Sequence, residues 1–162
     1  MATLTKLEDK LGEVMGLAQA AEQATTTVRG MVKDDGLAQV LAQMRDEAHE
    51  TVERCRDVAG GIDGKKTAIT EKARETKREA AEMMSTYLGE DAEALDGFEF
   101  LTMAEAGEVG HWEVLGAMAS SARDSEIAGL VEWALPIQER HLADARSSSV
   151  ALAGAEDPAS ES

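Results

Sequence analysis

The sequence predicts an all-helical protein, and three features of the chain lead to that fold class. Alanine, glutamate, leucine and methionine, which favour helices, are abundant, whereas prolines number only two and aromatic residues make up 3%. Apolar residues recur at intervals of three and four over long stretches, and no convincing stretch alternates apolar and polar residues as a strand does. A length of 162 residues is that of one domain with a buried core.

The first two helices form a predicted hairpin. One is expected at about residues 3–32 and ends at the turn-forming sequence 34–36. The other is expected at about 37–59 and ends at the glycine-rich segment 60–64, because glycine favours turn and left-handed backbone geometry. The link between them is too short for anything but an antiparallel arrangement.

The rest of the chain predicts a crossover and a second hairpin. A polar helix at about 65–88 has a narrow apolar stripe, so we expect it to pack outside the bundle as a partly exposed crossover. Two further helices are expected at about 92–121 and 125–147, again as an antiparallel pair. Residues 147–162 are small, polar and unpatterned, which predicts a disordered tail after a bundle domain at 1–146.

Charge and cysteine content restrict the function and the compartment. The net charge is −16, from 32 acidic and 16 basic residues, which argues against nucleic-acid or anionic-membrane partners because both need clustered lysine and arginine. No apolar run approaches membrane-spanning length. A single cysteine, Cys55, excludes an internal disulfide, and the N-terminal sequence is unlike a signal peptide. We therefore expect a cytoplasmic protein.

Ionisable side chains fall on the apolar faces of the fourth and fifth predicted helices. At about 100° per residue, Glu105, Glu108 and His111 share a face with Phe98 and Trp112. In the fifth helix, Gln138 and His141, also three residues apart, share the apolar face. Buried ionisable groups are costly unless they are paired or bind a metal.

Polar side chains of four predicted helices are expected at the same level along the bundle axis. Glu22 and Glu47 lie on the margins of the faces of the first and second helices, each about twelve residues from the turn between them. Around the turn near residue 123, Glu108 is level with Gln138, and Glu105 with His141. Polar, metal-capable side chains of four helices are thus expected in one layer, where they are the candidate metal ligands: Glu22, Glu47, Glu105, Glu108, His111, Gln138 and His141.

This pattern resembles the ferritin-like superfamily, and within it most of all the bacterial stress-response ferritin-like metal-binding proteins. The segment Glu105-Ala-Gly-Glu108-Val-Gly-His111-Trp resembles their acidic His-aromatic segment, and Glu47-Ala-His-Glu50-Thr51-Val-Glu-Arg resembles their second helix. The resemblance covers roughly residues 4–146. It implies an antiparallel four-helix bundle of two hairpins with a crossover, in which four helices provide Glu and Glu-x-x-His ligands to two metals.

The resemblance implies metal ligands at Glu22, Glu47, Glu105, Glu108, Gln138 and His141, and the sequence departs from the full pattern twice. Glu50 stands where that pattern has histidine, and Gln138 where it has glutamate, so one ion, two ions or none are open outcomes. Carboxylates with imidazole suit Fe or Mn, and also Zn. The expected assembly is a homodimer or higher homo-oligomer.

Three functions fit these residues. The first is a stress-linked iron or manganese protein, acting if catalytic as a metal-dependent oxidase or on peroxide. The second is a non-catalytic scaffold that kept the fold and lost the site, in which Glu108 and His141 form a metal-free pair; the polar segment 70–82 resembles late-embryogenesis-abundant repeats and favours this interpretation. The third is a metal-dependent hydrolase or a small-molecule binder with a cavity in the bundle.

Overall fold

The computed structural model describes all 162 residues and contains five helices and no strand, which confirms the all-α class. The first four helices begin and end within three residues of the expected bounds. No membrane-spanning helix is found among the five. Their bounds are α1 (Lys6–Arg29), α2 (Asp35–Gly61), α3 (Lys66–Tyr87), α4 (Ala94–Ala122) and α5 (Ser125–Ala155).

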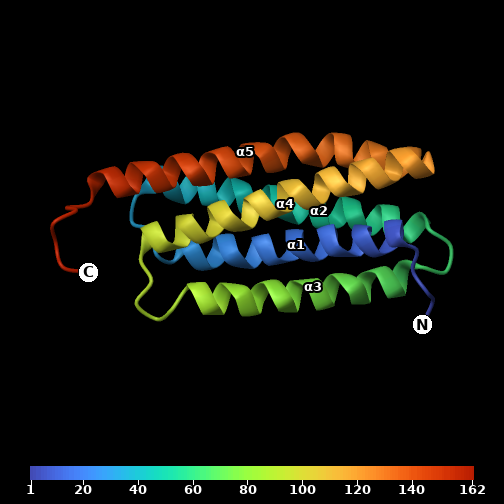
Figure 1. Cartoon of the computed structure of the whole chain (residues 1–162), viewed down its shortest axis with the longest axis horizontal. Coiled ribbons are helices and arrows are strands. Elements are labelled where there is room, and N and C mark those ends of the chain that lie inside the picture. Colours follow the sequence, from blue (N-terminus) through green and yellow to red (C-terminus); the bar gives the residue numbers. More distant parts are fainter.

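Four of the helices form a bundle of two antiparallel hairpins (Figure 1). α1 pairs with α2, and α4 pairs with α5, while α1 also packs on α4 and α2 on α5. Each of these four contacts joins helices that run in opposite directions. α3 lies outside this bundle along α1 and returns the chain over the full length of the molecule. α3 thus connects the two hairpins.

Side-chain caps fix the helix starts. The Thr5 hydroxyl accepts a hydrogen bond from the Glu8 backbone N–H, and the Glu8 carboxylate accepts one from the Thr5 N–H. Asp34 caps α2 and Asp124 caps α5 in the same way, each through a carboxylate that accepts a backbone N–H. These caps satisfy backbone donors that would otherwise have no partner, so the turns occur where the sequence places them.

Two glycines of α1 let α3 approach closely. A Cβ atom on Gly16 would lie 2.4 Å from the carbonyl oxygen of Ala73, and one on Gly12 would lie 2.8 Å from Cβ of Lys72. Any larger residue at these positions would push the two helices apart. α3 is thus held against α1 and makes little contact with α4.

The C-terminal helix is longer than the sequence predicted. α5 continues to Ala155, so the expectation of disorder from residue 147 is wrong for the first part of that segment. Ser148 is buried, Leu152 packs against the core, and the Ser149 hydroxyl lies 3.2 Å from that of Thr102 on α4. Small residues suffice here because α4 runs alongside and supplies the larger side chains.

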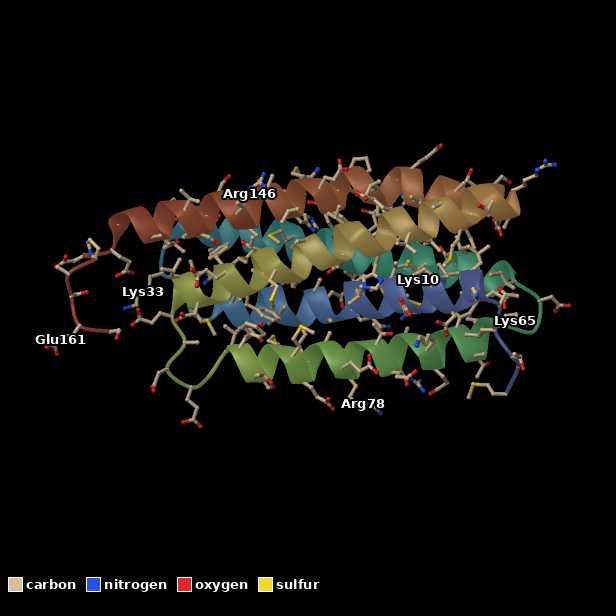
Figure 2. The ribbon with its side chains drawn as sticks, viewed as in Figure 1. Lys10, Lys33, Lys65, Arg78, Arg146 and Glu161 are labelled. Carbon is tan, nitrogen blue, oxygen red and sulfur yellow. The ribbon has the colours of Figure 1, made fainter.

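The core consists of two apolar clusters separated by a polar layer. One cluster surrounds Trp112 and the other surrounds Phe98, whereas charged side chains such as Arg78 and Arg146 project outward (Figure 2). On α4 the clusters occupy positions 98–101 and 112–119, and on α5 they occupy 127–134 and 145. The helical turns between them carry the buried polar side chains of both helices.

Candidate functional site: a buried polar layer

Four polar side chains from α4 and α5 are buried between the two apolar clusters. Glu105, Glu108, Gln138 and His141 are each exposed by 3% or less. Both pairs are spaced three residues apart, which places them on the inner faces of their helices. The expectation that these four face inward is confirmed. Burial at this depth requires that the groups be paired, protonated or bound to a cation.

Gln138 connects the two carboxylates. With its amide in the orientation that satisfies the hydrogen bonds, Gln138 donates to Oε2 of Glu105 at 3.0 Å and to Oε2 of Glu108 at 3.1 Å. His141 Nδ1 lies 3.7 Å from Oε2 of Glu105. The metal-free pair expected between Glu108 and His141 is therefore not formed, because His141 faces Glu105 instead.

The layer favours the neutral form of Glu108. Burial first, and the nearby charge of Glu105 second, raise the pKa of the Glu108 carboxyl well above its usual value of 4.5. Burial, assisted by Glu108, also raises the pKa of the Cys55 thiol to about 12. Two like charges this close in an apolar interior repel each other, so a proton or another cation is favoured between the carboxylates.

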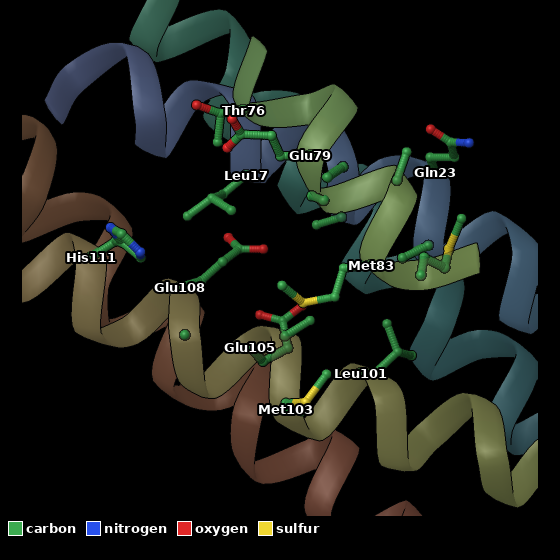
Figure 3. A pocket seen from close by; sticks show the side chains of 18 of the residues that line it. Leu17, Gln23, Thr76, Glu79, Met83, Leu101, Met103, Glu105, Glu108 and His111 are labelled. Atoms are coloured by element: carbon green, nitrogen blue, oxygen red, sulfur yellow. The ribbon is translucent and has the colours of Figure 1, made fainter. Parts of the chain in front are cut away.

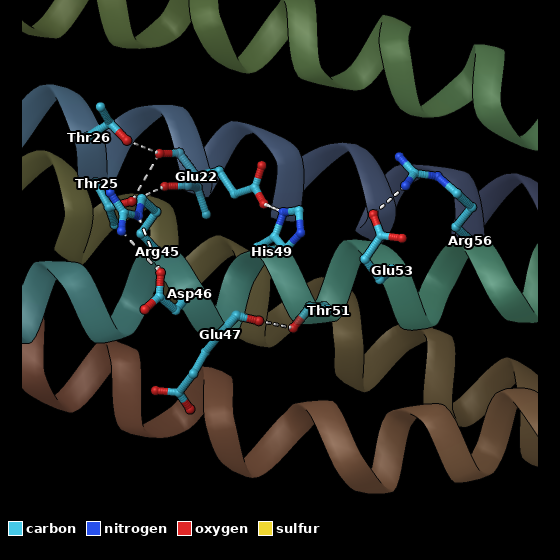
Figure 4. A network of polar contacts seen from close by, with 11 residues as sticks. Glu22, Thr25, Thr26, Arg45, Asp46, Glu47, His49, Thr51, Glu53 and Arg56 are labelled. Atoms are coloured by element: carbon cyan, nitrogen blue, oxygen red, sulfur yellow. Dashed lines mark hydrogen bonds and ion pairs between the residues drawn. The ribbon is translucent and has the colours of Figure 1, made fainter.

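The outer nitrogen of His141 faces Glu47 of α2. His141 Nε2 and Glu47 Oε1 are 3.6 Å apart, and both atoms are buried without a hydrogen-bond partner. Figure 4 shows Glu47 extending from α2 towards α5. Its other oxygen, Oε2, pairs with the Arg140 guanidinium. An imidazole nitrogen and a carboxylate oxygen thus lack partners at the same place in the bundle.

Glu22 does not join the polar layer. Its Oε1 lies 2.6 Å from Nδ1 of His49, whose side chain is 67% exposed, and this pair lies on the surface away from Glu47 (Figure 4). The expectation that Glu22 and Glu47 sit opposite one another is therefore wrong. Being level along the bundle axis does not bring two residues together when each lies on a different margin of its helix.

His111 also lies outside the layer, contrary to expectation. Its side chain is 43% exposed, with Nδ1 3.3 Å from Oε2 of Glu13 and 3.4 Å from Nζ of Lys10. The neighbouring Trp112 is fully buried and occupies the inward direction. Because successive helical residues are rotated by about 100°, His111 then turns towards α1 and the surface.

The expected metal ligands do not gather into one cluster in this structure. No three side chains of the types His, Cys, Asp and Glu converge as ligands of one ion. Of the seven expected ligands, the structure brings together Glu105, Glu108, Gln138 and His141, with Glu47 at the edge of the layer. Glu22 and His111 belong to surface ion pairs.

A groove reaches the layer from the side of α1 and α3. Its volume is about 350 Å³, and it is lined by residues of α1, α3 and α4. Figure 3 shows Glu105 and Glu108 directed into this groove. The groove was not predicted from the sequence, although the alanines Ala20, Ala21 and Ala24 and the closely packed glycines of α1 were signals of a narrow, recessed helix face.

Comparison with known proteins adds no relative. No protein-family model, curated protein or solved structure matches this chain. The ferritin-like resemblance therefore stays a prediction, and the functional argument depends on the geometry of the polar layer.

Proposed function

We propose that the protein binds one divalent transition-metal ion, Fe or Mn, between α2 and α5 through His141 and Glu47. The observation that carries the proposal is the pair of buried atoms without partners, Nε2 of His141 and Oε1 of Glu47. A buried polar atom without a partner destabilises the folded protein, so a cation that ligates both would remove two such penalties at once.

The spacing of the two atoms fits a shared ion. Ligands bound at about 2.1 Å in tetrahedral geometry lie about 3.4 Å from one another. His141 Nε2 and Glu47 Oε1 are 3.6 Å apart, so little movement is needed for both to bind one ion. Imidazole with carboxylate is a donor set that suits iron and manganese, and also zinc. Water would complete the coordination.

The neighbouring residues support His141 as a ligand. Metal-binding histidines commonly donate their other ring N–H to a carboxylate, which leaves the ligating nitrogen bare. Glu105 lies near Nδ1 of His141 in that role, and Gln138 in turn donates to Glu105. The buried layer thereby orients the imidazole with Nε2 towards Glu47.

The helix arrangement supports a ferritin-like assignment for this metal protein. Two antiparallel hairpins joined by a connection that spans the bundle length are what the resemblance implied. A redox-active ion bound by few protein ligands has open positions for dioxygen or peroxide, which fits a role in oxidative stress. We propose one ion rather than two because Glu22 and His111 lie in surface pairs.

A second candidate is a metal-free helical scaffold. The observation that favours it is that Arg140 already pairs with Glu47, while Gln138 bridges Glu105 and Glu108. A proton on His141 would then complete a Glu–His–Glu pairing without any ion. In this case the polar layer would fix the register of the helices, and the fold would serve interactions at the surface.

Titration calorimetry with Mn(II), and with Fe(II) under anaerobic conditions, separates the two candidates. Untagged wild-type protein should bind one ion per chain, and Glu47→Gln and His141→Gln should each weaken binding at least about tenfold. Glu22→Gln and His111→Gln are matched controls, because they make the same chemical change at surface pairs, and binding should be unchanged. Wild-type protein that binds no ion, or equal losses in the controls, would favour the scaffold instead.

A further inference from the structure

The groove between α3 and α4 has the form of a ligand site. A volume of about 350 Å³ lies within the range of small-molecule pockets. Residues of α1, α3 and α4 line the groove, and the carboxylates of Glu105 and Glu108 are directed into it (Figure 3). Glu47 approaches the polar layer from α2 instead, so the groove and the proposed ion lie on different sides of Glu105.

Apolar side chains line the walls and remain exposed at the mouth. Leu17 of α1, Met84 of α3 and Leu101 of α4 line the groove. At its edge, Met83 is 53% exposed and Met103 is 38% exposed. Methionines adapt their shape to apolar partners, and neighbouring exposed apolar side chains are typical of binding surfaces. The walls are suited to a flexible hydrocarbon chain.

The part of the groove around Glu105 and Glu108 is acidic. Gln138 donates one hydrogen bond to Glu105 and one to Glu108, and His141 Nδ1 lies 3.7 Å from Oε2 of Glu105 on the side away from the groove. The basic residues of the lining face other carboxylates: Lys72 forms ion pairs with Asp9 and Glu75 outside the groove, and His111 lies beside Glu13. A cationic donor is therefore the group that these two carboxylates would accept, whereas an anion would be repelled.

We propose that the groove binds a primary alkylamine as its ammonium ion, with the –NH₃⁺ group between Glu105 and Glu108 and the alkyl chain along the Met83 and Met103 walls. An ammonium has three donors and suits two adjacent carboxylates. This activity goes beyond metal binding and uses the opposite side of the layer. A fatty acid carries the wrong charge for a position between two carboxylates, and an alcohol carries no charge.

Calorimetric titration with octylamine, nonylamine and decylamine, at concentrations below those at which they aggregate, tests the proposal. Affinity should rise about fourfold with each added methylene, as expected for a chain that enters an apolar groove. Decanol and decanoate, which share the chain length, should bind at least about tenfold more weakly than decylamine. Equal affinity for the three decyl compounds, or no binding of any amine, would overturn the proposal.

Matched variants test each part of the site. Glu108→Gln should weaken decylamine binding at least about tenfold, whereas Glu99→Gln, an exposed position on the same helix, should not. Gly107→Leu should block the groove, because Gly107 lines it and a Cβ there meets no atom within 4 Å. Gly110→Leu makes the same change at an exposed position outside the groove and should bind decylamine normally.

Two further results distinguish an amine site from the metal site and from a contact between two copies of the chain. Glu47→Gln should lose metal binding but keep decylamine binding, so that failure of one proposal does not imply failure of the other. Light scattering after size exclusion should show that Gly107→Leu does not change the oligomeric state. The groove is an interface for a second copy, and the amine proposal is wrong, if three results are found together. These are self-association of the wild-type protein, loss of self-association in Gly107→Leu, and no binding of decylamine.

Discussion

Replacing Glu108 with glutamine should make the protein more stable at neutral pH and leave its stability unchanged in acid. In the folded protein, burial and the charge of Glu105 raise the pKa of Glu108 well above 4.5, the value expected for the unfolded chain. Between these two values the folded state holds a proton that the unfolded state has released. Folding stability therefore falls as pH rises through this range, and below pH 4.5 the full stability is present.

The magnitude follows from the linkage between protonation and folding. Each pH unit between 4.5 and the raised pKa costs wild type about 1.4 kcal/mol of unfolding free energy. The glutamine variant carries no titrating group at this position and still presents an oxygen to the Gln138 amide. A difference of this size is a large part of the stability of a typical domain.

Urea unfolding at several pH values from 4 to 8 measures this difference. The gap between Glu108→Gln and wild type should be near zero at pH 4 and should widen as pH rises. Glu99→Gln, an exposed change of the same kind on α4, should follow the wild-type profile. Parallel profiles for Glu108→Gln and wild type would show that Glu108 titrates normally and that the carboxylates of the buried layer do not repel each other.

Three further predictions concern the thiol, the helix contact and the C-terminus. Cys55 should resist thiol reagents in the folded protein, because burial raises its pKa to about 12. The unfolding free energy should therefore fall above pH 9, by about 1.4 kcal/mol per pH unit up to the folded pKa, and Cys55→Ala should remove this alkaline loss. Gly16→Ala should lower the unfolding free energy by about 1–3 kcal/mol through a clash with α3, whereas Gly129→Ala, with open space around it, should not lower it. Truncation after Ala155 should leave the melting temperature unchanged, whereas truncation after Arg146 should lower it, because packed residues of α5 are lost.

Periodicity predicted the parts of this structure that depend on one helix at a time. The helices themselves and the inward direction of Glu105, Glu108 and His141 follow from spacing alone. The direction of His111 was predicted wrongly. Two adjacent residues, His111 and Trp112, cannot both face the core, and the larger apolar side chain of Trp112 takes that place. A helical wheel with a broad apolar face does not distinguish its centre from its margin.

Features that depend on contacts between helices could not be predicted from the sequence. The sequence places Glu22 and Glu47 at the same level along the bundle axis, but the orientation of α1 directs Glu22 to His49 on the surface. The groove exists because Gly12 and Gly16 draw α3 onto α1 and away from α4, a consequence that appears only when the three helices are placed together. The end of α5 depends similarly on α4 as its neighbour.

The most direct test of ion binding by His141 and Glu47 is to measure the chemical shifts of the histidine ring nitrogens. Long-range proton–nitrogen spectra of ¹⁵N-labelled protein, recorded with and without the diamagnetic ion Zn(II), report each nitrogen of the three histidines separately. We predict that one equivalent of Zn(II) shifts Nε2 of His141 alone, while Nδ1 stays protonated beside Glu105. A spectrum in which both nitrogens of His141 are protonated before and after Zn(II), or in which only His49 or His111 responds, would contradict an ion site at His141 and Glu47.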